Sequence, residues 1–113
     1  MYRNKNNGEL RKENIGEFVT LSGWVSKKRN FGNLVFIDLR DRYGITQLVF
    51  NSSFGEFVAN IRNEYVIRVE GEVVLRESIN KNIPTGEIEI IVSDVKVLSE
   101  AKLTPFIIAD DTD

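Results

Sequence analysis

The chain has 113 residues, which is enough for one compact domain but too few for two domains with separate hydrophobic cores. Hydrophobic residues make up 42% and charged residues 28%, as in an ordinary globular domain, and 15 basic against 17 acidic residues give a net charge of −2. The absence of histidine and cysteine excludes imidazole-based triads, thiolate catalysis, disulfides and Cys-ligated zinc, and no apolar run approaches the roughly 20 residues of a membrane-spanning helix.

The first half of the chain alternates between apolar and polar residues, which is the pattern of strands with one buried face. The first predicted strand covers residues 19–26, and the polar stretch 27–33 predicts a loop or the end of that strand. A second strand at residues 34–41 and a third at 45–50 form a hairpin through the turn 42–44, whose glycine could supply the positive φ of a tight turn.

The pattern then changes to the period of a helix. Residues 51–53 offer side chains that can cap a helix N-terminus. Apolar residues follow at helical spacing, at Phe54, Phe57, Val58 and Ile61. These positions predict a short amphipathic helix of about two to three turns.

Two more strands complete the pattern. Residues 65–76 predict a long strand, in which Gly71 suggests a bulge or a sharp bend, and the polar loop 77–86 leads to a fifth strand at 87–98. This order of elements is that of the OB-fold, an all-β, five-stranded Greek-key barrel with one short helix between strands three and four. A sandwich of this size usually needs about seven strands.

An OB-fold barrel binds its ligands on the face formed by the second and third strands. Phe36 lies on that face of the second strand, where a base could stack on its ring; alternatively both faces are buried and Phe36 belongs to the core. Gln47, on the third strand, carries a donor and an acceptor that could read a base edge, or it is a polar residue that faces solvent.

Three charged residues border the same face if this topology is right. Arg29, at the end of the first strand, and Arg76, at the end of the fourth, could each bind a phosphate or a base, and each could equally be plain surface. Glu89, in the last strand, could accept a hydrogen bond from a base amino group, or it faces solvent.

Charge is unevenly distributed along the chain. Residues 24–44 carry a balance of +3, and residues 84–113 carry −5. A basic region of this kind can bind a polyanion, although an unevenly charged, solvated surface explains it as well. Within this region Asp38 and Asp41 alternate with Arg40 and Arg42, so surface ion pairing explains the two carboxylates better than acid–base catalysis.

Several segments together form a long and specific signature. They are Gly-Trp-Val at residues 23–25, Phe-Ile-Asp-Leu-Arg-Asp-Arg at 36–42, Gln-Leu-Val-Phe at 47–50, Arg-Asn-Glu-Tyr at 62–65 and Pro-Thr-Gly-Glu-Ile-Glu at 84–89. With these segments the chain closely resembles the N-terminal anticodon-binding domain of bacterial-type aspartyl-tRNA synthetases, over roughly residues 8–107.

The resemblance implies binding to the anticodon loop of tRNA(Asp), whose anticodon is GUC. It implies that Phe36 stacks on the middle base and that Gln47 forms hydrogen bonds with it. The other anticodon-binding residues that it implies are Arg29, Phe31, Arg76, Asn80, Asn82 and Glu89. Residues 28–31 read Lys-Arg-Asn-Phe where the family commonly has Arg-Arg-Asp, which leaves open whether tRNA(Asn) is also accepted.

The resemblance also implies a division of the chain. Residues 1–17 would be an N-terminal extension that packs on the barrel, 18–99 the OB-fold domain, and 100–113 the start of a linker to a missing catalytic domain. The fragment would need no cofactor, whereas the parent enzyme, a cytoplasmic homodimer, would use ATP and Mg²⁺ to form aspartyl-tRNA. Two other functions remain open: a stand-alone module that binds single-stranded nucleic acid, and a protein-interaction module.

Overall fold

The computed structural model describes residues 3–100, so the expected linker at 100–113 lies outside the described residues except for its first one. Short 3₁₀ helices are written η. The elements in chain order are β1 (Arg3–Asn4), η1 (Lys12–Asn14), β2 (Phe18–Phe31), β3 (Leu34–Asp41), β4 (Gly44–Phe50), η2 (Ser52–Phe54), α1 (Gly55–Ala59), β5 (Val66–Leu75) and β6 (Ile88–Ser99).

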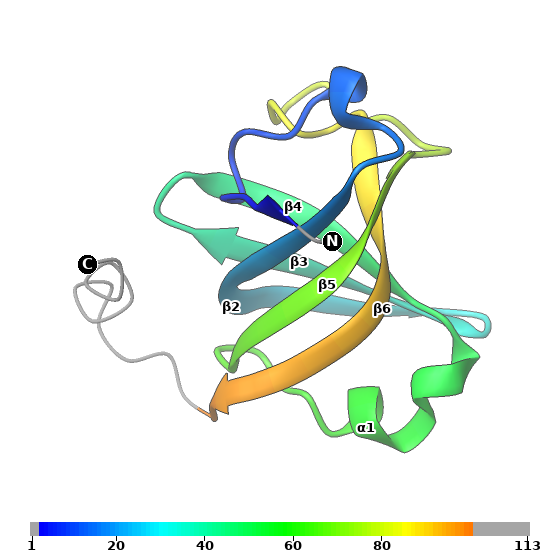
Figure 1. Cartoon of the computed structure of the whole chain (residues 1–113). Coiled ribbons are helices and arrows are strands. Elements are labelled where there is room, and N and C mark those ends of the chain that lie inside the picture. Colours follow the sequence, from blue (N-terminus) through cyan, green and yellow to red (C-terminus); the bar gives the residue numbers. More distant parts are fainter. Residues whose placement is uncertain (1–2, 101–113) are drawn as a thin grey trace.

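The long strands close into a barrel (Figure 1). Hydrogen bonding runs in the order β2-β3-β4-β6-β5, and β5 pairs with β2 to complete the ring. Only β4 and β6 are parallel neighbours in this ring, and the short β1 adds in parallel to β2. The register of β5 and β6 shifts between Glu70 and Gly71, where the sequence predicted a bulge. The predicted OB-fold barrel is confirmed.

Aliphatic side chains fill the inside of the barrel. Alternate residues of the strands are buried, among them Val19 and Leu21 in β2 and Ile37 and Leu39 in β3. Leu10, which precedes β2, is fully buried in the same cluster. Because each fully buried aliphatic side chain contributes about 1.5–3 kcal/mol, this core fixes the strands and therefore the positions of the residues on their outer faces.

The segment between β4 and β5 contains a shorter helix than predicted. Asn51 acts as the expected cap, because its side chain accepts a hydrogen bond from the backbone N–H two residues later. Gly55, with φ of 42°, separates η2 from the single turn of α1. Helix α1 lies at one end of the barrel (Figure 1). Val58 and Ile61 are buried in the core cluster, whereas Phe57 is exposed rather than part of the apolar stripe. Among the described residues, no helix has the length and apolar character needed to cross a membrane.

Strand β2 continues through the segment in which the sequence predicted a loop. After an irregularity between Val25 and Lys27, the strand pairs with β3 as far as Phe31. The sequence pattern does not predict this extension, because its side chains are polar and do not alternate. The strand forms nevertheless, because its backbone groups pair with those of β3. The hairpin turns at Gly32, whose φ is 62°. As a result, Arg29 lies on a regular strand, directly opposite Phe36.

Gly44 permits a close approach of two backbone segments and has no positive φ. A Cβ atom at Gly44 would lie 2.8 Å from the Cα atom of Gly8 and 3.0 Å from the carbonyl oxygen of Asn7. Asp41 fixes this arrangement, because its carboxylate accepts hydrogen bonds from the backbone N–H groups of Asn7, Tyr43 and Gly44 at 2.8–3.1 Å. Asp41 is therefore an acceptor for backbone groups, and the predicted pairing with neighbouring arginines is wrong for it.

Candidate nucleic-acid interface

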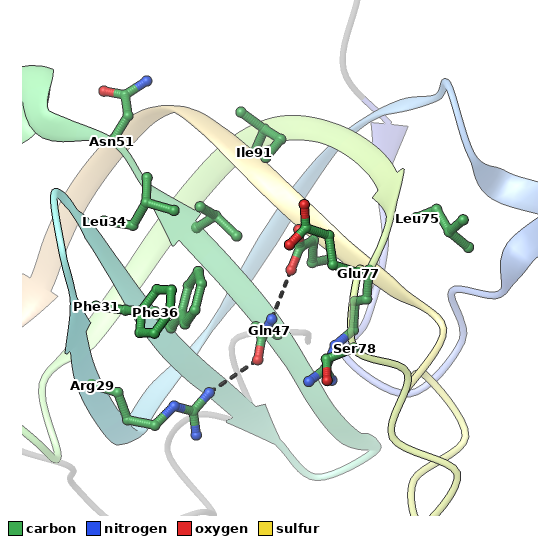
Figure 2. Close-up of a pocket in the computed structure, with 13 residues that line it drawn as sticks. Arg29, Phe31, Leu34, Phe36, Gln47, Asn51, Leu75, Glu77, Ser78 and Ile91 are labelled. Atoms are coloured by element: carbon green, nitrogen blue, oxygen red, sulfur yellow. Dashed lines mark hydrogen bonds between the residues drawn. The ribbon is translucent and has the colours of Figure 1, made fainter.

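A cavity of about 700 Å³ opens on the outer face of β3, β4 and β6 (Figure 2). The ends of β2 and β5 form its two sides. Its polar lining consists of Arg29, Gln47, Asn51, Arg76, Glu77, Ser78 and Glu89. Its apolar lining consists of Phe31, Leu34, Phe36, Val49, Leu75 and Ile91.

Two phenylalanine rings stand together in this cavity. Phe36 is partly buried and lies outside the barrel core, while Phe31 is 69% exposed. Figure 2 shows the two rings side by side; their centroids are 6.1 Å apart and their planes differ by 18°. The pair presents flat, partly exposed aromatic surface, on which a heteroaromatic ring can stack. The interpretation of Phe36 as a core residue is therefore wrong.

Gln47 lies between Arg29 and Glu89 on the floor of the cavity. Its Oε1 accepts a hydrogen bond from Nη2 of Arg29 at 3.0 Å, and its Nε2 donates to Oε1 of Glu89 at 2.7 Å (Figure 2). The contact with Glu89 depends on the parallel pairing of β4 with β6, in which these two residues are direct partners. Gln47 is only 7% exposed, so the interpretation of this residue as solvent-facing is wrong.

Asp38 forms an ion pair with Arg29 and not with the neighbouring arginines Arg40 and Arg42. Nη1 and Nη2 of Arg29 lie 3.3 and 3.2 Å from the two carboxylate oxygens of Asp38, a two-pronged contact. Asp38 is a direct cross-strand neighbour of Gln47 but does not line the cavity. Asp38 thus forms a surface ion pair, as predicted, but its partner is Arg29 and not Arg40 or Arg42.

Arg76 follows the end of β5 and lines the cavity opposite Arg29. Its backbone N–H donates to the carbonyl oxygen of Glu87, which holds the residue in place. Its Nε atom is buried and has no hydrogen-bond partner within residues 3–100. Since a buried donor without a partner is energetically unfavourable, this group is suited to bind a ligand or an ordered water.

The structure does not bring Asn80 and Asn82 to the cavity. Both lie in the loop between β5 and β6, and neither is among the lining residues. The side chain of Asn80 accepts a hydrogen bond from the backbone of Asn82, and its backbone N–H donates to Gly86, so the two residues shape the loop.

Lys28, next to Arg29 in the basic stretch, points away from this site. Its Nζ donates to the carbonyl oxygens of Val58, Ala59 and Ile61 at 2.7–3.2 Å, at the C-terminal end of α1. Burial lowers the pKa of Lys28 below its ordinary value, and the positive charge of Arg62 lowers it further. Lys28 therefore fixes the helix to β2.

Sequence reasoning missed most of the apolar lining. Leu34, Val49 and Ile91 share strand faces with Phe36, Gln47 and Glu89, so the alternation along each strand was the signal for them. Leu75, Glu77 and Ser78 carry no comparable signal, because they enter the cavity only through the way β5 ends.

The cavity combines stacking surface with a balanced set of polar groups. Two guanidinium groups, Arg29 and Arg76, face two carboxylates, Glu77 and Glu89, so the lining has no net charge. An uncharged site of this kind is poorly suited to a phosphate alone. It is suited to a planar base whose face stacks and whose edge forms directional hydrogen bonds.

The closed barrel, with this cavity on the outer face of its strands, defines an OB-fold domain with a candidate ligand-binding face. The chain belongs to the family described as the OB-fold nucleic acid binding domain, whose sequence pattern matches residues 19–98. Within this family it matches bacterial aspartate–tRNA ligases over almost its whole length, which confirms the resemblance to their anticodon-binding domain.

Two relatives and one solved structure illustrate the match. The aspartate–tRNA ligase of Mycoplasma mycoides is 49% identical over 111 residues, 98% of this chain and 19% of that protein. The aspartate–tRNA(Asp/Asn) ligase of Parvibaculum lavamentivorans is 51% identical over 117 residues, 99% of this chain and 19% of that protein. The asparaginyl-tRNA synthetase of Pyrococcus horikoshii superposes with a TM-score of 0.73 at 27% identity, covering 88% of this chain and 24% of that one. The chain thus spans about a fifth of the length of these curated relatives.

Proposed function

We propose that the cavity binds the anticodon loop of tRNA(Asp) and reads its GUC triplet. The observation that carries this proposal is the position of Phe36 beside Gln47, which offers a stacking surface and a directional amide to one and the same base. The match to aspartate–tRNA ligases supports tRNA(Asp) as the source of that base.

The middle base, uracil, stacks on Phe36 and pairs with Gln47. The contacts of Gln47 with Arg29 and Glu89 use one lone pair of Oε1 and one N–H of Nε2. A second lone pair and a second N–H remain for the base edge. Uracil offers a complementary donor, N3–H, beside an acceptor, O4.

The outer two bases bind at the two sides of the cavity. Arg29 has five N–H groups, and its contacts with Asp38 and Gln47 occupy three of them. Arg76 lines the opposite side of the cavity, and Glu89 can accept a hydrogen bond from a base amino group. Phe31 extends the stacking surface toward a neighbouring base.

For the whole protein we propose the activity for which its relatives are named, formation of aspartyl-tRNA, with ATP and Mg²⁺ and by a homodimer in the cytoplasm. The relatives extend well beyond this domain, and that remaining part would carry the chemistry. The role proposed for the residues of this chain is to hold and select the tRNA.

Binding of fluorescent anticodon stem-loops tests the function. We expect the GUC stem-loop to bind more tightly than stem-loops with a changed middle base, and its affinity to fall with rising salt because phosphates are also contacted. Equal binding of all stem-loops and of polypyrimidine strands would instead indicate a module that binds single strands without sequence preference. Binding that does not depend on salt, or no binding, would contradict nucleic-acid recognition.

A further inference from the structure

We infer that Asp38 is a positioning residue that fixes the orientation of the Gln47 amide and thereby determines which pyrimidine the cavity accepts. This inference rests on the proposed function, because it concerns the base that Gln47 reads. Asp38 does not line the cavity, so its effect on a bound base passes through Arg29.

Asp38 fixes the geometry of Arg29. Its two terminal nitrogens contact both oxygens of Asp38 at 3.2 and 3.3 Å, which fixes the plane of the guanidinium group. One of these nitrogens, Nη2, also donates to Gln47 at 3.0 Å. Asp38 thus holds the donor that Gln47 requires, in an ion pair that is partly exposed, since the side chains of Arg29 and Asp38 are 37% and 22% exposed.

Only one orientation of the Gln47 amide satisfies both of its neighbours, Arg29 and Glu89. A guanidinium group can only donate hydrogen bonds, and a carboxylate can only accept them. The oxygen of Gln47 must therefore face Arg29, and its NH₂ group must face Glu89, as observed. A rotation of the amide by 180° would place N–H against N–H and oxygen against oxygen, with two partly buried hydrogen bonds lost.

The orientation of the amide determines which base edge it can match. A base that is held in place by Phe36 meets the remaining lone pair of Oε1 and the remaining N–H of Nε2 in a fixed order. Uracil presents a donor at N3 and an acceptor at O4, whereas cytosine presents an acceptor at N3 and a donor at N4. The same edge therefore matches one of these bases in one orientation of the amide and the other base after rotation.

Because Asp38 is negatively charged, its removal affects RNA affinity differently from the removal of a residue that contacts the base. A negative group beside a polyanion weakens attraction in general, so its removal should not weaken binding of RNA as such. A residue that contacts the base directly would lose affinity and discrimination together. Removal of a positioning residue of this kind should lower the affinity for the uracil stem-loop without lowering the affinity for the cytosine one.

The first test compares Asp38→Asn with the unchanged protein, using stem-loops with GUC and GCC anticodons. We expect the preference for uracil over cytosine to fall at least fivefold, while affinity for the GCC stem-loop stays within twofold or increases. In a Gln47→Ala background, the same substitution should have no further effect on the ratio. Asp94→Asn, at an exposed carboxylate in β6, is the matched control and should leave the ratio unchanged.

An unchanged ratio in folded Asp38→Asn, or an equal fall in the Gln47→Ala background, overturns the inference. If Asp38→Asn does not fold, Arg29→Lys replaces it. A lysine ammonium cannot form the two-pronged contact with Asp38 and also donate in plane to Gln47, so the same fall in the ratio is expected, and an unchanged ratio overturns the inference.

A second readout uses the free protein and separates this inference from the proposed function. The side-chain NH₂ signals of Gln47 in an ¹⁵N spectrum should show slowed exchange with water, and Asp38→Asn should speed this exchange. If the exchange is unaffected by Asp38→Asn, the positioning role fails even where GUC is recognised. If the exchange responds but no stem-loop binds, the positioning of the amide stands, and the assignment of base selection fails together with the proposed function.

Discussion

Replacing Phe36 by alanine separates a binding residue from a core residue, because the two roles affect different quantities. Phe36 lines the cavity, is partly buried and packs on Phe31 with 6.1 Å between ring centroids. Phe50 is its matched control. It lies on the adjacent strand β4, is fully buried, and contacts Phe54 edge to face at 5.3 Å.

The structure gives the expected magnitudes. Phe36→Ala removes the stacking surface for one base, about 1–3 kcal/mol, so the GUC stem-loop should bind about 5- to 150-fold more weakly. The free energy of unfolding should fall only by the contact with Phe31, about 0.5–1.5 kcal/mol. Phe50→Ala should instead lower the free energy of unfolding by about 3–5 kcal/mol, because it leaves a cavity in the core.

The assay pairs stem-loop titration with urea unfolding of each variant. The reasoning is refuted if Phe36→Ala loses about 3–5 kcal/mol of unfolding free energy while its folded fraction binds the stem-loop normally. That result would assign Phe36 to the core and leave the cavity without a stacking surface.

Three further predictions concern contacts around the site. Gln47→Glu replaces the N–H that Glu89 accepts by a second carboxylate, so it should lower the urea unfolding free energy by about 1–3 kcal/mol; unchanged stability would contradict the contact. Lys28→Met removes three hydrogen bonds to the end of α1 and should lower the urea unfolding free energy by about 1–2 kcal/mol without weakening stem-loop binding, whereas a selective loss of binding would place Lys28 at the interface. Gly44→Ala should destabilise by about 1–3 kcal/mol, unlike Gly32→Asn, where no atom lies within 4 Å of the added Cβ and asparagine tolerates the positive φ; equal effects would refute the close approach.

Strand alternation predicts the barrel and the outward position of Phe36. The reason is that side chains of a strand point to opposite faces in turn, so buried aliphatic residues such as Ile37 and Leu39 place Phe36 on the other face. The hairpin that joins β3 to β4 places Gln47 on the adjacent strand. Exposure does not follow from the rule, because Phe31 and Arg29 reach over this face from an extension of β2 whose polar residues resemble a loop.

The contacts between side chains in the site could not be predicted from the sequence. Gln47 and Glu89 are 42 residues apart and meet only because β4 and β6 pair in parallel in one particular register. Asp38 has two arginines within four residues of it, and it nevertheless pairs with Arg29 across the hairpin. Partners of this kind depend on the closed barrel, whose register a local pattern does not encode.

Titration of the ¹⁵N-labelled chain with a GUC anticodon stem-loop tests the central claim most directly. The account predicts that the largest shifts of the NMR signals fall on Phe36, Gln47, Arg29 and Arg76, and that a stem-loop with a changed middle base produces weaker shifts at the same residues. Shifts centred on another face of the barrel, or equal shifts with every stem-loop, would contradict it.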